Sequence, residues 1–398
     1  MKTYIDCFWI SIFIAVGLFV SLPAQQTENV IVAVVDGARF TETIGDSTHQ
    51  NIPFMWNLLR PQALTCDSVY IDGVTKTLSG HAAILSGCWQ RLANDGTESP
   101  HCPTLFEYYR ASTGVDSTEA WLVLGKEKLQ IVAHSDAAGY GAEYGASVRF
   151  SEHQYDDSEA LQSVLDVMAE YQPHLLMVNF GQTDYMGHCL VWERYVNAIA
   201  QSDSLIYLLW QAIQNNDHYR DKTTLIITND HGRHLEEWTE HGDDCEGCAH
   251  VMMMVLGPEV IPGSRHMERI SQIDIAPTVG WLMGFDTPYA EGASLESLFV
   301  PPSAVWPAKS TAPVLALSPC YPNPFCQDVS VDVQLLQAQY IDLAVFDAMG
   351  RRMETLFTGR LQAGTHHFTQ SADHWARGTY FFALHVAGKV VTQKAVAF

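Results

Sequence analysis

The chain has 398 residues, of which 47% are hydrophobic, so it is long and apolar enough for one large domain plus a smaller one. Its formal net charge is −23, from 45 acidic and 22 basic residues, which argues against duplex nucleic acid or an anionic membrane surface as a partner. A small anionic substrate is still compatible with this charge, because bound divalent metals invert the local field.

Residues 1–24 are predicted to be a signal peptide. They begin with the weakly positive Met1-Lys2, continue with an apolar stretch over residues 7–20, and end in a small residue, Ala24, at a plausible cleavage site. The apolar stretch is short for a membrane span, which needs roughly 20 residues. An uncleaved anchor is the alternative. We expect an exported protein with no transmembrane anchor after processing.

Eight of the nine cysteines remain once the signal peptide is removed, and an even number is typical of disulfides in an oxidising compartment. Eight cysteines allow about 105 pairings, so spacing alone does not fix the pattern. Neighbours in sequence suggest Cys88 with Cys102, Cys245 with Cys248, and Cys320 with Cys326, which leaves Cys66 and Cys189. The Cys245-x-x-Cys248 motif could hold zinc, but without a second CxxC motif a disulfide is favoured.

Three apolar runs, residues 29–35, 174–180 and 224–228, are predicted to be strands buried on both faces of a parallel sheet. Each is followed by polar residues at its carboxyl end, where open α/β sheets bind their ligands. These residues are Asp36, then Asp184 and His188, and then Asp230 and His231. One such residue would be explained by a turn or a cap, but its recurrence after three strands indicates a metal site.

A predicted strand at 68–71 leads into a predicted helix that starts near Gly80 and stops at Gly87. Thr77 and Ser79 lie at the start of this helix, where free N–H groups and the positive end of the dipole suit a phosphate. Simple capping of the helix is the alternative role for either hydroxyl.

The remaining elements alternate along the chain and predict an α/β fold with a mainly parallel central sheet flanked by helices. Further strands are expected at 120–124 and 251–256, and helices at 104–109, 158–171, 192–215 and 273–283. Residues 299–318 are rich in Pro, Ala and Ser, as in a linker. Short alternating segments separated by glycines then predict a small all-β sandwich at 319–398.

Six acids and imidazoles, counting one histidine from the loop after His231, would suffice for two three-ligand zinc sites with open positions. Two metals roughly 3.5–4 Å apart can clamp the attacking and leaving oxygens of a displacement at phosphorus. Coordination to one of them would also turn a threonine hydroxyl into an alkoxide nucleophile.

These pieces, in this order and spacing, resemble the alkaline phosphatase superfamily, especially its type I phosphodiesterase/nucleotide pyrophosphatase branch with a threonine nucleophile. The resemblance covers about residues 29–285 and implies a catalytic domain at 25–298. The matching motifs are Asp36-Gly37, Thr77-Leu78-Ser79-Gly80-His81, Asp184-x-x-Gly187-His188, Asp230-His231-Gly232 and His241-Gly242.

The resemblance implies a role for each of these residues. Thr77 would be the nucleophile, and Asn94 an amide that hydrogen-bonds the transferred group. One zinc, in contact with Thr77, would be held by Asp36, Asp230 and His231. The other zinc, which carries the attacking water, would be held by Asp184, His188 and His241. His250 is the alternative to His241, followed by His234.

Two departures from the family pattern matter. The family's Thr-x-Pro-Asn-His is here Thr77-Leu78-Ser79-Gly80-His81, so Ser79 is a rival nucleophile. The maturing Cys/Ser-x-Pro-x-Arg segment of sulfatases is absent, since Cys102-Pro103-Thr104 lacks the spacing and the Arg. We therefore expect a secreted two-zinc phosphoester hydrolase that acts on small phosphate esters through a phospho-threonine intermediate. A sulfatase-like hydrolase, a phosphotransferase or mutase, and a non-catalytic surface-binding module are the alternatives.

The tail resembles the C-terminal sorting domain of proteins exported by the type IX (Por) secretion route. The supporting segments are 321–325, 345–350, 361–364 and 378–380, with sequences YPNPF, VFDAMG, LQAG and GTY. The resemblance implies recognition by the type IX machinery and secretion or attachment at the cell surface. A generic carbohydrate-binding or spacer sandwich is the alternative.

Overall fold

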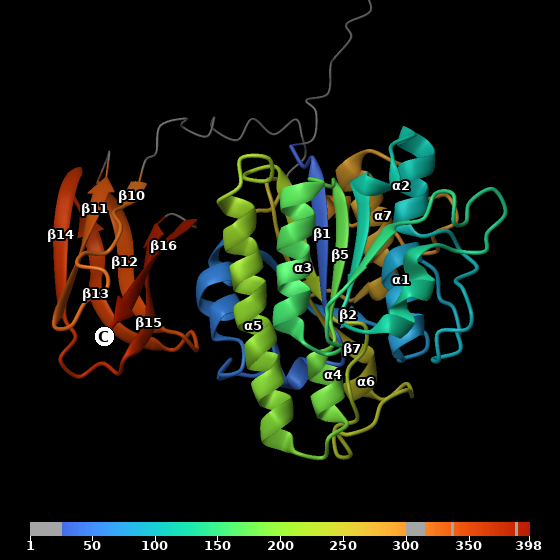
Figure 1. Ribbon diagram of the computed structural model, residues 1–398, viewed down its shortest axis with the longest axis horizontal. Helices are drawn as coiled ribbons and strands as arrows, with labels where there is room; N and C mark the ends of the chain where they lie inside the picture. Colours follow the sequence, from blue (N-terminus) through green and yellow to red (C-terminus); the bar gives the residue numbers. More distant parts are fainter. Residues whose placement is uncertain (1–25, 300–314, 336–337, 387–388) are drawn as a thin grey trace, which may run out of the picture.

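The computed structural model describes residues 26–299, 315–335, 338–386 and 389–398 (Figure 1). The predicted signal peptide, residues 1–24, lies outside these residues, as does most of the predicted linker. The described chain forms a large sheet covered by helices and, next to it, two small antiparallel sheets. The predicted fold class, α/β with an additional all-β sandwich, is confirmed.

The large sheet has nine strands in the order β4-β3-β5-β1-β6-β7-β2-β8, with β9 paired to β2. The strands from β4 to β6 in this order are parallel, whereas β7 is antiparallel to both of its neighbours. The strands are β1 (Asn29–Val35), β2 (Leu64–Tyr70), β3 (Ala120–Leu124), β4 (Ser147–Phe150), β5 (Leu175–Phe180), β6 (Thr223–Thr228), β7 (His250–Leu256), β8 (Arg265–His266) and β9 (Ile270–Ser271).

Helices cover both faces of this sheet, which explains why its central strands are apolar throughout. Alternate residues of β1 belong to two different cores: Ile31 packs on the side of α3 and α5, and Val32 on the side of α1, α2 and α7 (Figure 1). The helices are α1 (Thr77–Ser86), α2 (Leu105–Thr113), α3 (Asp157–Glu170), α4 (Gln182–Gly187), α5 (Trp192–Gln214), α6 (Glu246–Ala249) and α7 (Ile275–Met283). Short 3-10 or π turns occupy Phe40–Glu42, Met55–Leu59, Arg60–Gln62, Ser117–Glu119, Glu127–Ala133, Gln272–Asp274 and Glu296–Leu298.

Several predicted boundaries differ from the structure. Helix α1 begins at Thr77 rather than at Gly80, since the backbone is extended at Lys76 and helical from the next residue onward. The strand predicted at 68–71 begins at Leu64. The segment predicted as one helix at 273–283 enters through a 3-10 turn, and α7 starts at Ile275.

The C-terminal strands form two antiparallel sheets, β10-β11-β14 and β13-β12-β15-β16. Their bounds are β10 (Leu315–Leu317), β11 (Asp328–Leu335), β12 (Gln339–Asp347), β13 (Arg352–Leu361), β14 (Gly364–Ser371), β15 (Gly378–Val386) and β16 (Lys389–Ala397). A separate apolar core lies between them, with Phe325 and Phe382 fully buried. The sandwich contacts the larger domain at α5, where the Tyr207 hydroxyl donates to Thr392 Oγ1 at 2.8 Å. In the described part of the chain, every helix is too short or too polar to span a bilayer.

The buried carboxylate of Asp203, on α5, accepts the backbone N–H groups of Phe54 at 2.8 Å and Met55 at 2.7 Å. Asp203→Ala would leave both buried donors without a partner. We expect the free energy of unfolding to fall by about 1–3 kcal/mol, measured by urea denaturation. Asp203→Asn keeps one carbonyl acceptor and should lose less. Equal stability of the alanine variant and wild type would show that water satisfies these donors.

Candidate active site

The predicted metal ligands converge at the carboxyl edge of the sheet. Strand β1 lies between β5 and β6, so the residues that follow these three strands are spatial neighbours. Asp36 follows β1, and Asp230 and His231 follow β6. Asp184 lies on α4 directly after β5, rather than in a loop, and His188 ends that helix. The three segments therefore face one another despite being far apart in sequence.

Asp36, Asp230 and His231 form a fully buried group in which one ligand atom of each lies within 4.8 Å of the others. His231 Nε2 is 3.4 Å from Asp230 Oδ2 and 3.7 Å from Asp36 Oδ1. Tetrahedral zinc with bonds of about 2.0–2.1 Å would separate its ligand atoms by about 3.4 Å, so this group fits such an ion. His231 Nδ1 donates to the Gly232 carbonyl at 2.9 Å, which leaves Nε2 with its lone pair for a metal.

Two carboxylate oxygens in this group, Asp36 Oδ1 and Asp230 Oδ2, are buried and accept no hydrogen bond from any described residue. Buried carboxylate oxygens normally have partners, because desolvation without a hydrogen bond is costly. A divalent cation between the two carboxylates would satisfy both. This pair of unpartnered oxygens is the observation that best supports a metal site here.

Around Asp184, the potential ligands that converge are Asp184, His231 and His241, whereas the predicted ligand His188 contacts Asp184 from a more exposed position outside this group. Asp184 Oδ1 lies 3.4 Å from His188 Nε2 and 3.6 Å from His241 Nε2. His241 Nδ1 donates to the Thr75 carbonyl at 3.0 Å, so its Nε2 is the free nitrogen. Burial, aided by the neighbouring His231, lowers the pKa of His241 to about 3, which keeps the imidazole neutral and able to bind a metal. The rings of His231 and His241 stack at 3.8 Å, so the two groups are adjacent.

Two buried cations that sequence analysis missed contact these acids. Lys126 Nζ lies 2.6 Å from Asp184 Oδ2 and 2.8 Å from Asp36 Oδ2, and the Arg233 guanidinium contacts Asp184 Oδ1. Lys126 comes two residues after β3, at the same sheet edge as the acids. Its position shortly after a buried apolar strand is the sequence feature that could have predicted Lys126 as a site residue. Because Asp184 is already paired with two cations, its group is the less open of the two to a metal.

The charged groups shift one another's pKa values in opposite directions. Burial raises the pKa of Asp36, and the nearby Asp230 carboxylate raises it further. Burial acts upward on Asp230 too, but the His231 and His81 imidazoles outweigh it and hold the pKa of Asp230 below its usual value. For Asp184, Lys126 is the strongest of the influences that overcome burial and keep its pKa well below normal. The lowered pKa values of Asp184 and Asp230 favour their ionised form, which is the form that binds metal.

Thr77 is the first residue of α1, and its Oγ1 lies 3.5 Å from His231 Nε2. Only 1% of the residue is exposed, so a substrate reaches the hydroxyl only after neighbouring groups move. The rival Ser79 accepts the N–H of Leu92 at 3.1 Å through its hydroxyl and so supports the following loop. Asn94 Oδ1 accepts the N–H of Leu78 at 3.0 Å, which holds this amide beside the helix start. The geometry favours Thr77 over Ser79.

Gly80, the departure from the family motif, lies directly against the metal-binding segment. A Cβ at this position would be 2.2 Å from the backbone oxygen of Asp230, so a larger residue would push α1 away from that segment. The neighbouring His81 Nδ1 is 3.2 Å from Asp230 Oδ2 and 2.8 Å from the Thr77 carbonyl. The close approach of α1 thus places Thr77 beside His231.

The two alternative histidines lie close to other residues. His250 bonds the Asp67 carbonyl at 2.8 Å through Nε2 and stacks between Phe40 and Tyr70. His234 Nε2 lies 3.2 Å from Asp243. His241 is the histidine that meets Asp184.

The predicted disulfides are not formed in this structure, where all eight cysteines from Cys66 onward are free thiols. Cys88 and Cys102 nonetheless lie within hydrogen-bonding reach of each other, as do Cys245 and Cys248. Proximity in sequence thus placed two of the three pairs together, but it did not determine their chemistry.

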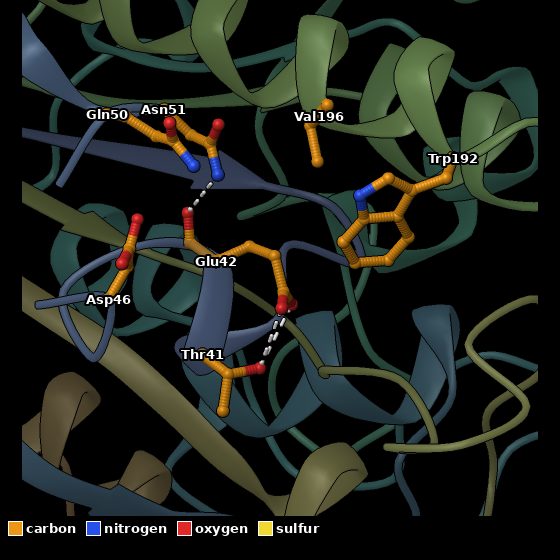
Figure 2. A pocket seen from close by; sticks show the side chains of 7 residues that line it. All are labelled: Thr41, Glu42, Asp46, Gln50, Asn51, Trp192 and Val196. Carbon is orange, nitrogen blue, oxygen red and sulfur yellow. Dashed lines mark hydrogen bonds between the residues drawn. The ribbon is translucent and has the colours of Figure 1, made fainter. Parts of the chain in front are cut away.

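A polar surface pocket of about 220 Å³ lies near the start of α5 (Figure 2). It is lined by Thr41, Glu42, Asp46, Gln50, Asn51, Trp192 and Val196. None of these is a predicted site residue, so this pocket is separate from the metal-binding groups.

A family model described as Sulfatase matches residues 29–285, well over half of the chain. The chain belongs to this sulfatase family. The match confirms the predicted membership of the alkaline phosphatase superfamily, whose enzymes use divalent metal ions. A second model, described as a secretion system C-terminal sorting domain, matches residues 319–397 and confirms the predicted tail. This sulfatase-family protein is therefore exported to the surface or the medium and carries the signal for the type IX machinery.

Curated relatives of the sulfatase-family protein include 2,3-bisphosphoglycerate-independent phosphoglycerate mutases. The one from Legionella pneumophila strain Corby is 33% identical over 119 residues, which is 29% of this chain and 21% of the mutase. The one from Ectopseudomonas mendocina strain ymp is 27% identical over 134 residues, 33% of this chain and 24% of the mutase. The chain thus spans about a fifth to a quarter of the length of these relatives.

Solved structures share the fold at low identity. Murine ectonucleotide pyrophosphatase/phosphodiesterase 5 has a TM-score of 0.52 at 11% identity, covering 68% of this chain and all of that one. A 2-O GAG sulfatase has a TM-score of 0.51 at 11% identity, covering 87% and 85%. The phosphonate monoester hydrolase of Agrobacterium radiobacter has a TM-score of 0.50 at 11% identity, covering 87% and 89%. These structures support the fold, but their names refer to different substrates: phosphodiesters, sulfate esters and phosphonate monoesters.

Proposed function

We propose that this protein is a secreted, metal-dependent phosphoester hydrolase that works through a covalent phospho-threonine intermediate. The supporting observation is the pair of unpartnered buried carboxylate oxygens of Asp36 and Asp230 beside the Thr77 hydroxyl. The carboxylate oxygens and imidazole nitrogens of the site suit zinc. Two zinc ions, when bound, would polarise the phosphoryl group of the substrate and favour ionisation of the nucleophile. Asp36, Asp230 and His231 would hold the ion near Thr77, and Asp184, His188 and His241 the other.

Thr77 Oγ would attack phosphorus, forming an O–P bond as the bond to the ester oxygen breaks. The hydroxyl would lose its proton on attack, and the departing ester oxygen would gain one and leave as the alcohol. Water would then attack the phospho-threonine, release phosphate and restore the hydroxyl. The positive end of the dipole of α1, whose first residue is Thr77, would favour the negative charge of a phosphoryl group carried by this residue. Asn94, held beside Leu78, would be close enough to this end of the helix to hydrogen-bond the transferred group.

A phosphate ester is favoured over a sulfate ester because the chain lacks the maturing segment of sulfatases and offers Thr77 instead. A phosphotransferase is the second candidate, supported by the local identity to the mutases. We further propose a signal peptide at 1–24, a catalytic domain at 25–298, a linker at 299–318 and a sorting domain at 319–398.

The test is a panel of phosphate monoesters, phosphate diesters, phosphonate esters and sulfate esters, assayed with zinc and after chelation. We expect turnover of a phosphate ester that chelation abolishes and zinc restores. Adding a sugar alcohol as acceptor separates hydrolysis from transfer, since a transferase would form a new ester. Turnover of sulfate esters alone, or turnover insensitive to chelation, would contradict the proposal.

A further inference from the structure

The loop that carries His241 is anchored at both of its ends. It follows the Asp230-His231 segment that comes after β6, and it ends in the short helix α6, whose backbone is hydrogen-bonded to the start of the loop. The N–H of Gly232 donates to the Cys248 carbonyl, and that of Arg233 to the Gly247 carbonyl, both at 2.8 Å. A Cβ on Gly232 would lie 2.0 Å from the Gly247 oxygen, so the two backbones are in direct contact. The Cys245-x-x-Cys248 turn is thus packed against the segment that holds His231.

Four side chains of this loop bring potential metal ligands together. One ligand atom from each of His234, Asp243, Cys245 and Cys248 lies within 4.8 Å of all the others. His234 Nε2 is 3.2 Å from Asp243 Oδ1, and the Asp243 carboxylate also interacts with both thiols. The group therefore converges on one point, although its members come from three parts of a 15-residue segment.

One shielded nitrogen of this group, on the partly buried His234, makes no hydrogen bond with any described residue. The nitrogen is Nε2, which lies close to Asp243 but is not hydrogen-bonded to it. A buried imidazole nitrogen without a partner is unfavourable, whether it carries a proton or a lone pair. A metal ion at the centre of the group would use this lone pair and the charge of Asp243 at once.

We propose that His234, Asp243, Cys245 and Cys248 bind one structural zinc ion, which fixes the loop that presents His241. Two sulfurs, one imidazole and one carboxylate complete a four-ligand set, and structural zinc sites use four protein ligands with no open position. Binding would release the two thiol protons. The site is separate from the nitrogen- and oxygen-only groups beside Thr77 and does not depend on the proposed hydrolase activity.

A disulfide between Cys245 and Cys248 is the competing outcome, since export exposes the thiols to an oxidising compartment. A disulfide would not explain why His234 and Asp243 lie next to these two sulfurs. The two states are chemically exclusive, because a disulfide sulfur is not a thiolate ligand. Measuring the state of the sulfurs therefore decides between them.

The experiment uses the full chain, purified without chelator and then loaded with cobalt(II) in place of zinc. Thiolate ligands give cobalt a charge-transfer absorption in the near ultraviolet that nitrogen and oxygen ligands lack, so the catalytic groups do not contribute. We expect this band in wild type and its loss in Cys245→Ser/Cys248→Ser, together with the loss of one zinc per chain by elemental analysis. Cys102→Ser, which removes a thiol outside the cluster, should keep both the absorption band and the zinc content of wild type.

Because the cobalt spectrum is taken on wild type, the proposal can be tested even if the double variant fails to fold. Mass analysis of the denatured chain after alkylation should find Cys245 and Cys248 both alkylated. Wild type without the absorption band, or with these two cysteines resistant to alkylation and the chain two hydrogens lighter, would overturn the proposal. Neither result would bear on the hydrolase, whose ligands contain no sulfur.

Discussion

Thr77→Ala is expected to lower kcat for a nitrophenyl phosphate by a factor on the order of 10³ or more, because it removes the only atom proposed to attack phosphorus. Alanine keeps the Cβ at the first position of α1, removes Oγ1 and Cγ2, and is a good helix former, so the helix and the metal ligands should be little disturbed. Steady-state kinetics at saturating zinc, with zinc content measured in parallel, would separate a lost nucleophile from a lost metal.

Two variants serve as controls for this prediction. Thr77→Ser restores a hydroxyl and should recover a substantial part of the lost rate. Ser79→Ala removes the rival hydroxyl, which supports the N–H of Leu92, and should affect stability more than turnover. The nucleophile assignment fails if Thr77→Ala keeps near-wild-type turnover, or if Ser79→Ala is the variant that abolishes it. Trapping of phosphate on the chain by rapid acid quenching would locate the modified residue directly.

Sequence patterns were sufficient to predict the fold class and to predict that most of the candidate ligands lie at one edge of the sheet, because both depend on strand ends. Asp36, Asp230 and His231 each follow a continuous apolar run, which is typical of a strand covered by helices on both faces. In the structure β1 does lie between β5 and β6. The register of a parallel sheet then brings these ends together without further information. The same logic succeeded for Asp184, although a short helix rather than a loop presents it.

What sequence patterns missed depends on contacts that no local periodicity encodes. Arg233 resembles an ordinary loop residue, yet it is fully buried against Asp184 because Gly187 leaves room for its guanidinium. The state of Cys245 and Cys248 depends on His234 and Asp243, which come near them only when the loop folds back on Gly232. Residues whose important contacts are all with distant parts of the sequence are therefore the ones that required coordinates.

Lys126 is the residue whose loss should most destabilise the fold in the absence of metal. Its ammonium group is buried between Asp36 and Asp184, and these carboxylates outweigh the effect of burial and raise its pKa. Lys126→Met keeps most of the side-chain volume but leaves buried negative charge uncompensated. Breaking one side of a buried ion pair typically costs about 3–5 kcal/mol, so we expect a loss of that order in the free energy of unfolding, measured in chelator.

Zinc should reverse most of this loss, since a divalent ion beside Asp36 would replace the missing positive charge. The stabilisation by zinc is thus expected to be larger for Lys126→Met than for wild type, measured as the shift in unfolding midpoint with zinc concentration. Lys128→Met is the matched control, because Lys128 Nζ bonds the Asn94 carbonyl at 3.3 Å rather than an acid. If both variants lose equal stability and respond equally to zinc, Lys126 does not balance the charge of the metal site. A selective response at Lys126 would instead mean that its ammonium group supplies, before any metal arrives, part of the positive charge that the buried acids of the metal site require.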